Sequence, residues 1–222
     1  MIFDADAHFS PTFLRNATAF GASPRMRFDI VLNNLAGLAW TTGRIAMTSN
    51  GMPWRPLVHV ADIARAMACA AEAPAHRVHG QVFNVGDNRE NYRVREIADI
   101  VGEAIPGCEV TFGDNGGDTR SYRVSFDKIQ SELPGFACTH DARCGARELV
   151  DIFTAVGMSR DVFEFRAFTR LAQLRYLLQS GQLDPSLRWT SARTDEGAGT
   201  VRSLTPLRGP VVAAPPVPAV AA

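Results

Sequence analysis

A short segment of this chain combines residues that are suited to bind a phosphate group. An Asn-Gly turn at residue 50 is followed by Trp54 and Arg55, and an apolar run and a helix come after them. A guanidinium group held between a tryptophan and a proline can contact a phosphate through two parallel hydrogen bonds. The residue types also fit a second arrangement, in which Arg55 stacks on Trp54 at the surface and Asp62 caps the following helix.

A second segment places polar groups at the end of a predicted strand. Asn16 and Thr18 follow the extended run of residues 12–15. Polar side chains at the carboxyl end of a strand in an α/β sheet line the crevice where ligands usually bind. The alternative for Asn16 and Thr18 is a set of turn hydrogen bonds with no ligand.

Further along the chain, Arg120 and Arg123 lie at the start of a predicted strand. Each guanidinium group could reach a phosphate. Each could equally form a solvated surface pair with Asp114 or Asp118, which would stabilise the fold little. The sequence leaves both arrangements open.

The elements that must position these residues alternate between strands and helices. Apolar residues spaced three and four apart indicate helices, and short β-rich runs between turn signals indicate strands. The predicted strands cover residues 12–15, 44–49, 56–60, 82–85, 109–112 and 122–126. The predicted helices cover residues 26–42, 62–72, 127–133, 142–156 and 168–180, with a further one that Asn91 caps and Pro106 ends. This alternation predicts an α/β fold with parallel strand pairing. His59 lies in an apolar strand, which indicates a core histidine with satisfied nitrogens.

Composition excludes several classes of function. The chain has 23 basic and 23 acidic residues in 222, so a neutral balance gives no support for a nucleic-acid partner or a membrane surface. It has no apolar run long enough to span a bilayer, and its first ten residues lack the order of a signal peptide. The four cysteines show no Cys-x-x-Cys spacing, so we expect buried free thiols and a cytoplasmic location.

The composition changes after Trp189. Residues 190–222 are rich in Ala, Pro, Gly, Val, Thr and Arg without a sustained period, which predicts a disordered tail after a folded region of residues 1–189. A shifted reading frame at the end of the gene is one hypothesis for this change. An in-frame match to the tail in close relatives would contradict it.

The sequence lacks the signature of a dinucleotide site. Such a site needs a glycine-rich turn between a strand and a helix, and neither Gly-x-x-Gly-x-x-Gly nor Gly-x-Gly-x-x-Gly occurs. The glycines of residues 113–117 are expected to form a surface turn, because polar residues follow them. A Tyr-x-x-x-Lys pair is also absent, since the single lysine, Lys128, lies six residues after Tyr122. We therefore expect no NAD or NADP to bind to this chain alone.

Several of these segments, taken in order, resemble the extended short-chain dehydrogenase/reductase family and its sugar-nucleotide epimerases and dehydratases. The resemblance rests on Arg15, Thr18 and Gly21, on GMPWRPLVHVADIARA from Gly51, on FNVG from Phe83, and on Asp118, Arg120 and Lys128. It covers roughly residues 10–189 and departs from the family pattern at three places. Thr18 stands where the family commonly has a substrate-contacting asparagine, Pro56 where it has aspartate, and Ala22 where it has proline.

The resemblance implies the C-terminal part of a Rossmann-like parallel sheet, interleaved with a small α/β substrate-binding domain. It implies that Arg55 and an arginine near Arg120 bind the diphosphate of a nucleoside-diphosphate sugar, with Asn16, Thr18 and Trp54 in the same site. In the family, NAD or NADP oxidises the sugar and returns the hydride. The loop and catalytic pair for that step would precede Met1, so this chain alone is expected to be inactive.

Three hypotheses remain at this stage. The first is the substrate-binding part of a NAD(P)-dependent epimerase/dehydratase, with a separately encoded N-terminal cofactor-binding half as a partner. The second is a non-catalytic nucleotide-sugar-binding or regulatory protein. The third is a poorly folding piece whose missing strands leave an apolar sheet edge open.

Overall fold

The computed structural model describes residues 10–114 and 120–190. The chain divides into two compact units, residues 1–176 and residues 177–222, with the boundary inside the last helix. The first unit holds the sheets and the pocket discussed below. Within the described ranges, every helix is too short or too polar to cross a membrane.

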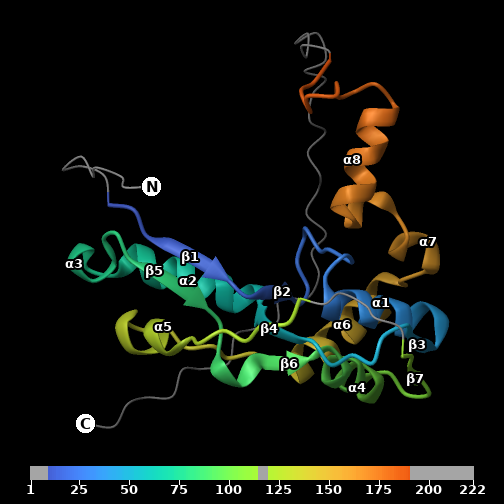
Figure 1. Cartoon of the computed structure of the whole chain (residues 1–222), viewed down its shortest axis with the longest axis horizontal. Coiled ribbons are helices and arrows are strands. Elements are labelled where there is room, and N and C mark those ends of the chain that lie inside the picture. The colour runs from blue at the N-terminus through green and yellow to red at the C-terminus, as the bar shows by residue number, and fades with distance from the viewer. Residues whose placement is uncertain (1–9, 115–119, 191–222) are drawn as a thin grey trace. The chain divides into compact units, whose positions relative to one another are not determined.

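Strands and helices alternate through the first unit (Figure 1). The strands are β1 (Phe13–Asn16), β2 (Thr18–Phe20), β3 (Arg44–Met47), β4 (Trp54–His59), β5 (Val82–Val85), β6 (Asn91–Arg93) and β7 (Glu109–Phe112). The helices are α1 (Val31–Thr42), α2 (Val60–Glu72), α3 (Ala75–Val78), α4 (Val94–Ala104), α5 (Asp127–Glu132), α6 (Ala142–Val156), α7 (Arg160–Phe163) and α8 (Arg170–Gln179). Two 3-10 turns, η1 (Asn88–Glu90) and η2 (Arg166–Phe168), complete the set.

Parallel pairing dominates, which confirms the predicted α/β class. β1 pairs with β5, β2 with β4, and β3 with β7, each in parallel, whereas β6 adds to β4 in the antiparallel direction. Only Ala17 separates β1 from β2, and its backbone N–H donates to the carbonyl of Val85 over 3.1 Å. One extended segment, residues 13–20, therefore pairs first with β5 and then with β4.

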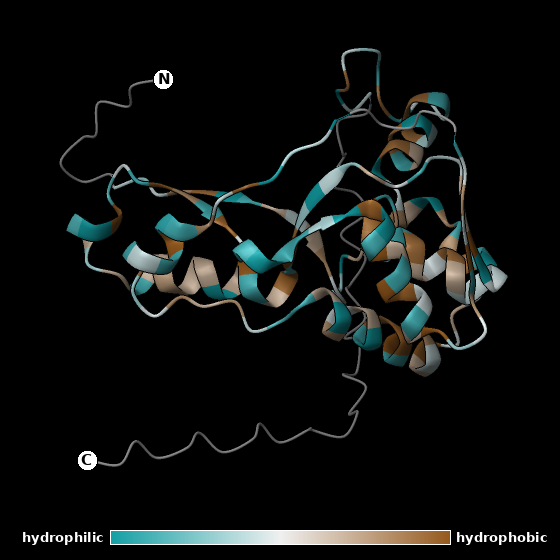
Figure 2. Ribbon diagram, turned by 60° about the horizontal axis from the view of Figure 1, so that its bottom comes forward, coloured by the Kyte–Doolittle hydropathy of each residue, from teal (hydrophilic) through white to brown (hydrophobic). Residues whose placement is uncertain are grey.

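Two hydrophobic clusters hold the first unit together. In one, α1, α4 and α6 bury their apolar faces against Phe20 and Leu57, which are both fully buried. Figure 2 shows these helices with hydrophobic residues on one side and hydrophilic residues on the other. In the second cluster, α2 and α5 pack with β5, centred on Phe83 and Phe126. The extended segment 13–20 runs between the two clusters, so it is fixed on both sides.

Several predicted boundaries were right. Gly43 ends α1 in the left-handed conformation at a φ of 70°, as its position predicted, and the bounds of β5, β7 and α6 match the predicted ranges. The predicted helix of residues 26–42 begins five residues late, at Val31. Residues before it are held by side chains instead, since the amides of Asn33 and Asn34 donate to the carbonyls of Arg27 and Phe28.

Two other predictions were wrong. Asn91 does not cap a helix: it begins β6, and α4 starts at Val94. Residues 122–126 do not form a strand. Two of their backbone N–H groups bond to side chains, as Val124 donates to Asn91 Oδ1 over 2.9 Å and Phe126 to Asn88 Oδ1 over 2.8 Å. The side chain of Asn91 therefore fixes this extended segment.

The four cysteines are free, as expected, but they are not all buried. Cys69, Cys108 and Cys138 are half-buried, and Cys144 is exposed on α6. The apolar pattern around Cys69 could predict burial only for Cys69. The exposure of Cys144 depends on which face of α6 packs against the rest of the fold. The predicted tail, residues 190–222, lies outside the described residues apart from its first residue, so its disorder stays a prediction.

Candidate functional site

A pocket with a volume of 420 Å³ lies where β1 passes into β2. Its wall consists of Arg15, Asn16, Ala17, Thr18, Pro56, Asn84, Tyr122, Val124 and Phe126. Asn16 and Thr18 thus lie in a crevice at the end of a parallel strand, where the sequence placed them. The lining that the structure describes includes a guanidinium group, amides and hydroxyls but no carboxylate. This composition suits a ligand that is anionic or rich in hydrogen-bond acceptors.

Arg55 is not among the residues that line this pocket, but it contacts Tyr122, which is. Its Cζ lies 5.6 Å from the centroid of the Tyr122 ring, a distance at which the cation is attracted to the ring. Its Nη1 donates to the carbonyl of Trp54 over 2.7 Å and also to the carbonyl of Arg120. Arg55 therefore joins β4 to the segment that carries Tyr122. It stacks on Tyr122 and not on Trp54, which corrects the surface-stacking alternative.

Trp54 has other cationic neighbours. The Cζ of Arg93 lies 5.3 Å from its ring centroid, and the Cζ of Arg123 lies 4.8 Å from it. Its backbone N–H donates to Ser121 Oγ over 3.1 Å. The register explains one of these contacts, because Trp54 and Arg93 are opposite each other in the antiparallel pair of β4 and β6. All five residues predicted for the site, Asn16, Thr18, Trp54, Arg55 and Arg120, thus lie in or beside this region.

Sequence reasoning missed several residues of this region. Asn84 follows Phe83 in β5 and enters the wall because β5 pairs with β1, and its amide donates to the carbonyl of Ser125 over 3.2 Å. Arg15 lines the same wall from the strand end. Arg93 was missed because β6 was not predicted. The alternation of side chains in a strand would have pointed to Arg93 had the strand been recognised.

The structure confirms that His59 is a core histidine with satisfied nitrogens. It is 2 % exposed, its Nδ1 accepts from the N–H of Ala61 over 3.2 Å, and its Nε2 lies 2.8 Å from Glu148 Oε2. His59 also occupies the N-cap position of α2, so the expectation that Asp62 caps this helix was wrong. Asp62 is 1 % exposed and accepts from the backbone and hydroxyl of Thr139 and from the backbone of His140, and its Oδ1 lies 3.3 Å from His140 Nδ1.

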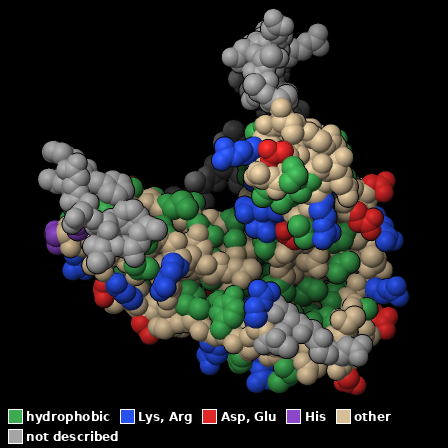
Figure 3. Space-filling view, turned by 45° about the horizontal axis from the view of Figure 1, so that its top comes forward, with side chains coloured by type: hydrophobic (Ala, Val, Ile, Leu, Met, Phe, Trp, Pro, Cys, Tyr) green, Lys and Arg blue, Asp and Glu red, His purple; other side chains and the backbone are tan. Residues whose placement is uncertain are grey.

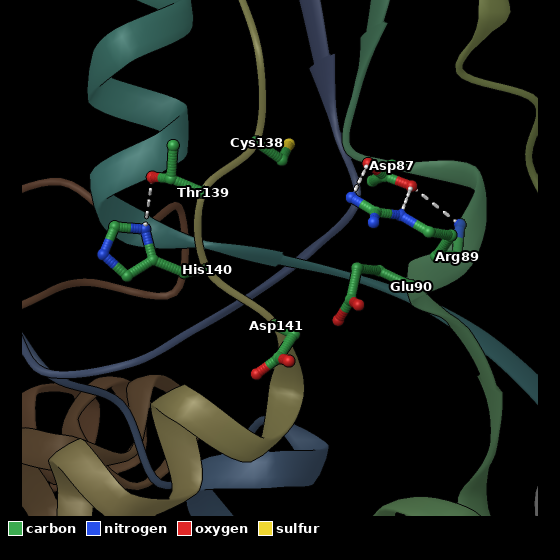
Figure 4. Close-up of a pocket in the computed structure, with 7 residues that line it drawn as sticks. All are labelled: Asp87, Arg89, Glu90, Cys138, Thr139, His140 and Asp141. Atoms are coloured by element: carbon green, nitrogen blue, oxygen red, sulfur yellow. Dashed lines mark hydrogen bonds and ion pairs between the residues drawn. The ribbon is translucent and has the colours of Figure 1, made fainter.

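A second pocket of 310 Å³ lies between η1 and the start of α6 (Figure 4). It is lined by Asp87, Arg89, Glu90, Cys138, Thr139, His140 and Asp141. In Figure 4 the guanidinium of Arg89 folds back onto Asp87: its Nε donates to Oδ1 over 3.0 Å and its Nη2 to Oδ2 over 2.9 Å. This ion pair holds the pKa of Asp87 below its usual range.

Glu90 is the unusual group of the second pocket. Its carboxylate accepts from the N–H of Ala142 over 3.0 Å and from the hydroxyl of Tyr92 over 3.1 Å. Burial nevertheless raises its pKa to about 7, because desolvation penalises the charged form. Burial likewise raises the pKa of the Cys138 thiol to about 12, so this thiol is a poor nucleophile at neutral pH. Glu90 is held by hydrogen bonds within the fold, and Cys138 is partly buried in it. The described residues contain no group of His, Cys, Asp and Glu side chains that could hold a metal ion.

Two turns at strand ends of the described residues lack the glycine-rich sequence of a dinucleotide site. A pyrophosphate of this kind needs a glycine-rich turn at the start of a helix. Neither the turn after β2 nor the one after β5 has such a sequence: Gly21 is followed by Ala22, and Gly86 is followed by Asp87.

The family comparison covers a stretch of sequence that contributes to the first pocket. Residues 2–86 match the model of the NAD dependent epimerase/dehydratase family. This epimerase/dehydratase-like region includes β1 to β5, and therefore Asn16, Thr18, Arg55 and Asn84 of the pocket region.

Solved structures show the same fold. UDP-glucuronic acid 4-epimerase from Bacillus cereus, crystallised with UDP-glucuronic acid and NAD, is similar at a TM-score of 0.56 and 19% identity over 67% of this chain. UDP-glucose 4-epimerase from Thermotoga maritima, with UDP-glucose, is similar at 0.53 and 21% over 64%. TunA, a NAD dependent NDP-hexosamine 5,6-dehydratase of tunicamycin biosynthesis, gives 0.53 and 16% over 67%.

These comparisons establish a Rossmann-like epimerase fold for the matched part of the chain. The chain spans less than half of the structures it matches, with 46% of the Bacillus cereus protein and 45% of the Thermotoga maritima protein covered. The matched part of the chain therefore has the fold of a part of these structures.

Proposed function

We propose that this chain forms the nucleotide-sugar-binding part of a NAD(P)-dependent epimerase or dehydratase. The observation that carries the proposal is the first pocket, where Arg15, Asn16, Thr18, Asn84 and Tyr122 present donors and no carboxylate. A nucleoside-diphosphate sugar has the matching chemistry, with two charged phosphates and several hydroxyls. The match of residues 2–86 to the epimerase/dehydratase family supports the same substrate class.

In this proposal Asn16 and Thr18 contact the ligand directly, and Arg55 and Arg120 lie at its diphosphate. Arg55 also orients Tyr122, because its guanidinium group is held against the ring and between two backbone carbonyls. Trp54 fixes the start of β4 through its bond to Ser121. The cofactor and the groups that transfer hydride and proton come from another polypeptide segment, since the described residues do not provide them.

Calorimetric titration of the purified chain with UDP-glucose and with UDP-glucuronic acid tests the substrate class. We expect saturable binding of at least one of them, and a loss of at least tenfold in Arg55→Ala and in Asn16→Ala. Tenfold corresponds to about 1.4 kcal/mol, which is within the range of one hydrogen bond to a charged group. Arg65→Ala is the matched control, because Arg65 is exposed on α2 away from the pocket lining.

If Arg55→Ala binds the sugar nucleotides with the same affinity as the wild type, Arg55 is not part of the binding site. Absence of binding by both sugar nucleotides would refute the proposal. A parallel titration with NAD and NADP tests cofactor binding separately from sugar-nucleotide binding. We expect neither cofactor to bind to this chain alone. Tight NAD binding would contradict the assignment of the cofactor site to another segment.

A further inference from the structure

Residues 121–126 form part of the wall of the first pocket, and we call them the strap. Tyr122, Val124 and Phe126 line the pocket, whereas the residues between them are exposed. This alternation is typical of an extended chain, in which every second side chain faces the same way. The strap nevertheless belongs to no strand of the fold, so its position depends on other bonds.

Side-chain amides hold one edge of the strap in place of a neighbouring strand. Asn91 bonds to both backbone groups of Val124: its Oδ1 accepts from the N–H over 2.9 Å, and its Nδ2 donates to the carbonyl over 3.0 Å. Asn88 Oδ1 accepts from the N–H of Phe126 over 2.8 Å. The N–H groups of alternate residues in an extended chain point to the same edge, so these two side chains take the bonds that a paired strand would take. We call Asn88 and Asn91 the asparagine pair.

The other edge and the two ends of the strap are held differently. Asn84 of β5 donates to the carbonyl of Ser125 over 3.2 Å. Phe126 is 1 % exposed in the second hydrophobic cluster, and it packs so closely on Gly86 that an added Cβ would lie 2.6 Å from its Cε1. Tyr122, at the other end, is 49 % exposed. The strap is therefore anchored at Phe126, and the asparagine pair holds the backbone that leads from there towards Tyr122.

The asparagine pair lies outside the pocket lining. Asn91 is 9 % exposed and lies opposite Pro56 in the pairing of β6 with β4. Its Nδ2 also donates to the carbonyl of Asn88 over 3.1 Å, and Asn88 Nδ2 donates to a carboxylate oxygen of Asp127. A buried amide that bonds to backbone groups outside a pocket can affect a ligand only through the segment that it holds.

The aromatic side chain at the open end of the strap is available to a ligand. Large hydrophobic side chains remain exposed at several places in the described residues, and one face of the molecule shows such side chains among charged ones (Figure 3). Tyr122 is one of these exposed side chains, and it is the one that also lines the pocket. An aromatic ring at a pocket wall can bury its face against a ligand, provided that its backbone holds it in place.

We propose that Asn88 and Asn91 are positioning residues for the ligand of the first pocket. They hold the strap in order before the ligand arrives, so binding does not have to order Tyr122 and Val124. The inference rests on the proposed function, because the ligand that it concerns is the nucleoside-diphosphate sugar. It adds a determinant of affinity that does not touch the ligand.

Calorimetric titration of the full chain with UDP-glucose and UDP-glucuronic acid tests the positioning role. We expect Asn88→Ala and Asn91→Ala each to weaken binding by at least about fivefold. Tyr122→Ala should weaken binding as well, because it removes a wall of the pocket. The double variant Asn91→Ala/Tyr122→Ala should bind more tightly than the product of the two single losses predicts, because Asn91 acts through the segment that carries Tyr122.

Asn34→Ala is the matched control. Asn34 is half-buried and its amide also donates to a backbone carbonyl, that of Phe28 over 2.8 Å, but it lies on α1 outside the pocket lining. It should bind like the wild type. Asn88 is exposed, so Asn88→Ala keeps the test valid if the buried change Asn91→Ala prevents folding.

Amide hydrogen exchange measures the strap directly. Without ligand, exchange at residues 124 and 126 should be faster in Asn88→Ala than in the wild type. A saturating sugar nucleotide should slow it to the wild-type level, because the ligand then orders the strap. A merely structural role of Asn88 would leave the faster exchange unchanged by ligand.

The outcomes separate this inference from the function on which it rests. If the wild type binds neither sugar nucleotide, the proposed function fails and the positioning role fails with it. If the wild type binds and both asparagine variants bind equally well, the function stands and the positioning role is overturned. Fully additive losses in the double variant would also overturn it, since Asn91 would then act by a route other than the strap.

Discussion

The imidazole rings of His59 and His140 are stacked, with centroids 4.3 Å apart and planes inclined by 18°. Each ring has a carboxylate neighbour from a different helix. Glu148 of α6 contacts His59 at 2.8 Å, and Asp62 of α2 lies 3.3 Å from His140 Nδ1. The pair therefore links β4, α2 and α6 at the point where the two hydrophobic clusters meet.

Asp62 should be a major anchor of the loop before α6. Asp62→Asn removes one carboxylate oxygen from a group that accepts bonds from Thr139 and His140 and is 1 % exposed. Leaving buried donors unsatisfied costs about 1–3 kcal/mol. We expect a loss of that size in urea denaturation. Asp99→Asn, an exposed change on α4, is the control and should stay within about 0.5 kcal/mol.

Equal stability of the Asp62→Asn and Asp99→Asn variants would show that the loop is held by other contacts.

Gly145 should resist replacement although it lies in the middle of α6. Alanine is the better helix former by about 1 kcal/mol. A Cβ at Gly145 would, however, lie 2.3 Å from Cε2 of Phe20, which is fully buried. We therefore expect Gly145→Ala to lower the melting temperature. The double variant Gly145→Ala/Phe20→Leu should recover part of the loss, because the smaller side chain makes room. A stabilised Gly145→Ala single variant would contradict this packing.

Glu90 should make stability depend on pH in the acid-to-neutral range. Its folded pKa of about 7 lies above the ordinary value of 4.5, so between these values the folded chain binds more protons than the unfolded chain. The contribution of Glu90 is therefore present in full below pH 4.5 and is lost as the pH rises through about 7. Other groups titrate as well, so the difference between the wild type and Glu90→Gln isolates it.

Glu90→Gln keeps the size of the side chain and stays neutral at all pH values. We expect it to gain stability relative to the wild type as the pH is raised from 5 to about 8, and to differ least at the acid end. The measurement is urea denaturation at a series of pH values. A difference that is constant with pH would show that Glu90 ionises at its ordinary pKa in the folded chain.

The local pattern of the sequence predicted most elements but not how they pair. Strand β5 and helix α6 were predicted from their apolar spacing and turn residues alone. β2 and β6 are three residues long, too short for a periodic signal, and they exist because β4 lies between them. Asn16 and Thr18 lie where β1 passes into β2, and the end of the predicted extended run was enough to identify them. Arg93 depends on the pairing of β6 with β4, which no local pattern encodes.

Arg55 presents the same contrast. The residue was identified from its position between Trp54 and Pro56, but its contacts were not. Its neighbours Tyr122 and Arg120 lie 67 and 65 residues away in sequence. The segment that carries them was predicted to be a strand, and it is instead held by side chains such as Asn91. Side-chain hydrogen bonds of this kind have no signature in composition or periodicity.

Arg55→Lys should loosen this segment while it keeps the positive charge. Lysine has no planar fork, so it cannot hold the carbonyls of Trp54 and Arg120 while it lies on Tyr122. We expect faster amide hydrogen exchange at residues 121–124, with little change in global stability, because the segment is largely exposed. Arg65→Lys on α2 is the control. Unchanged exchange at residues 121–124 would show that Asn91 and Ser121 hold the segment without Arg55, and that Arg55 acts on a ligand alone.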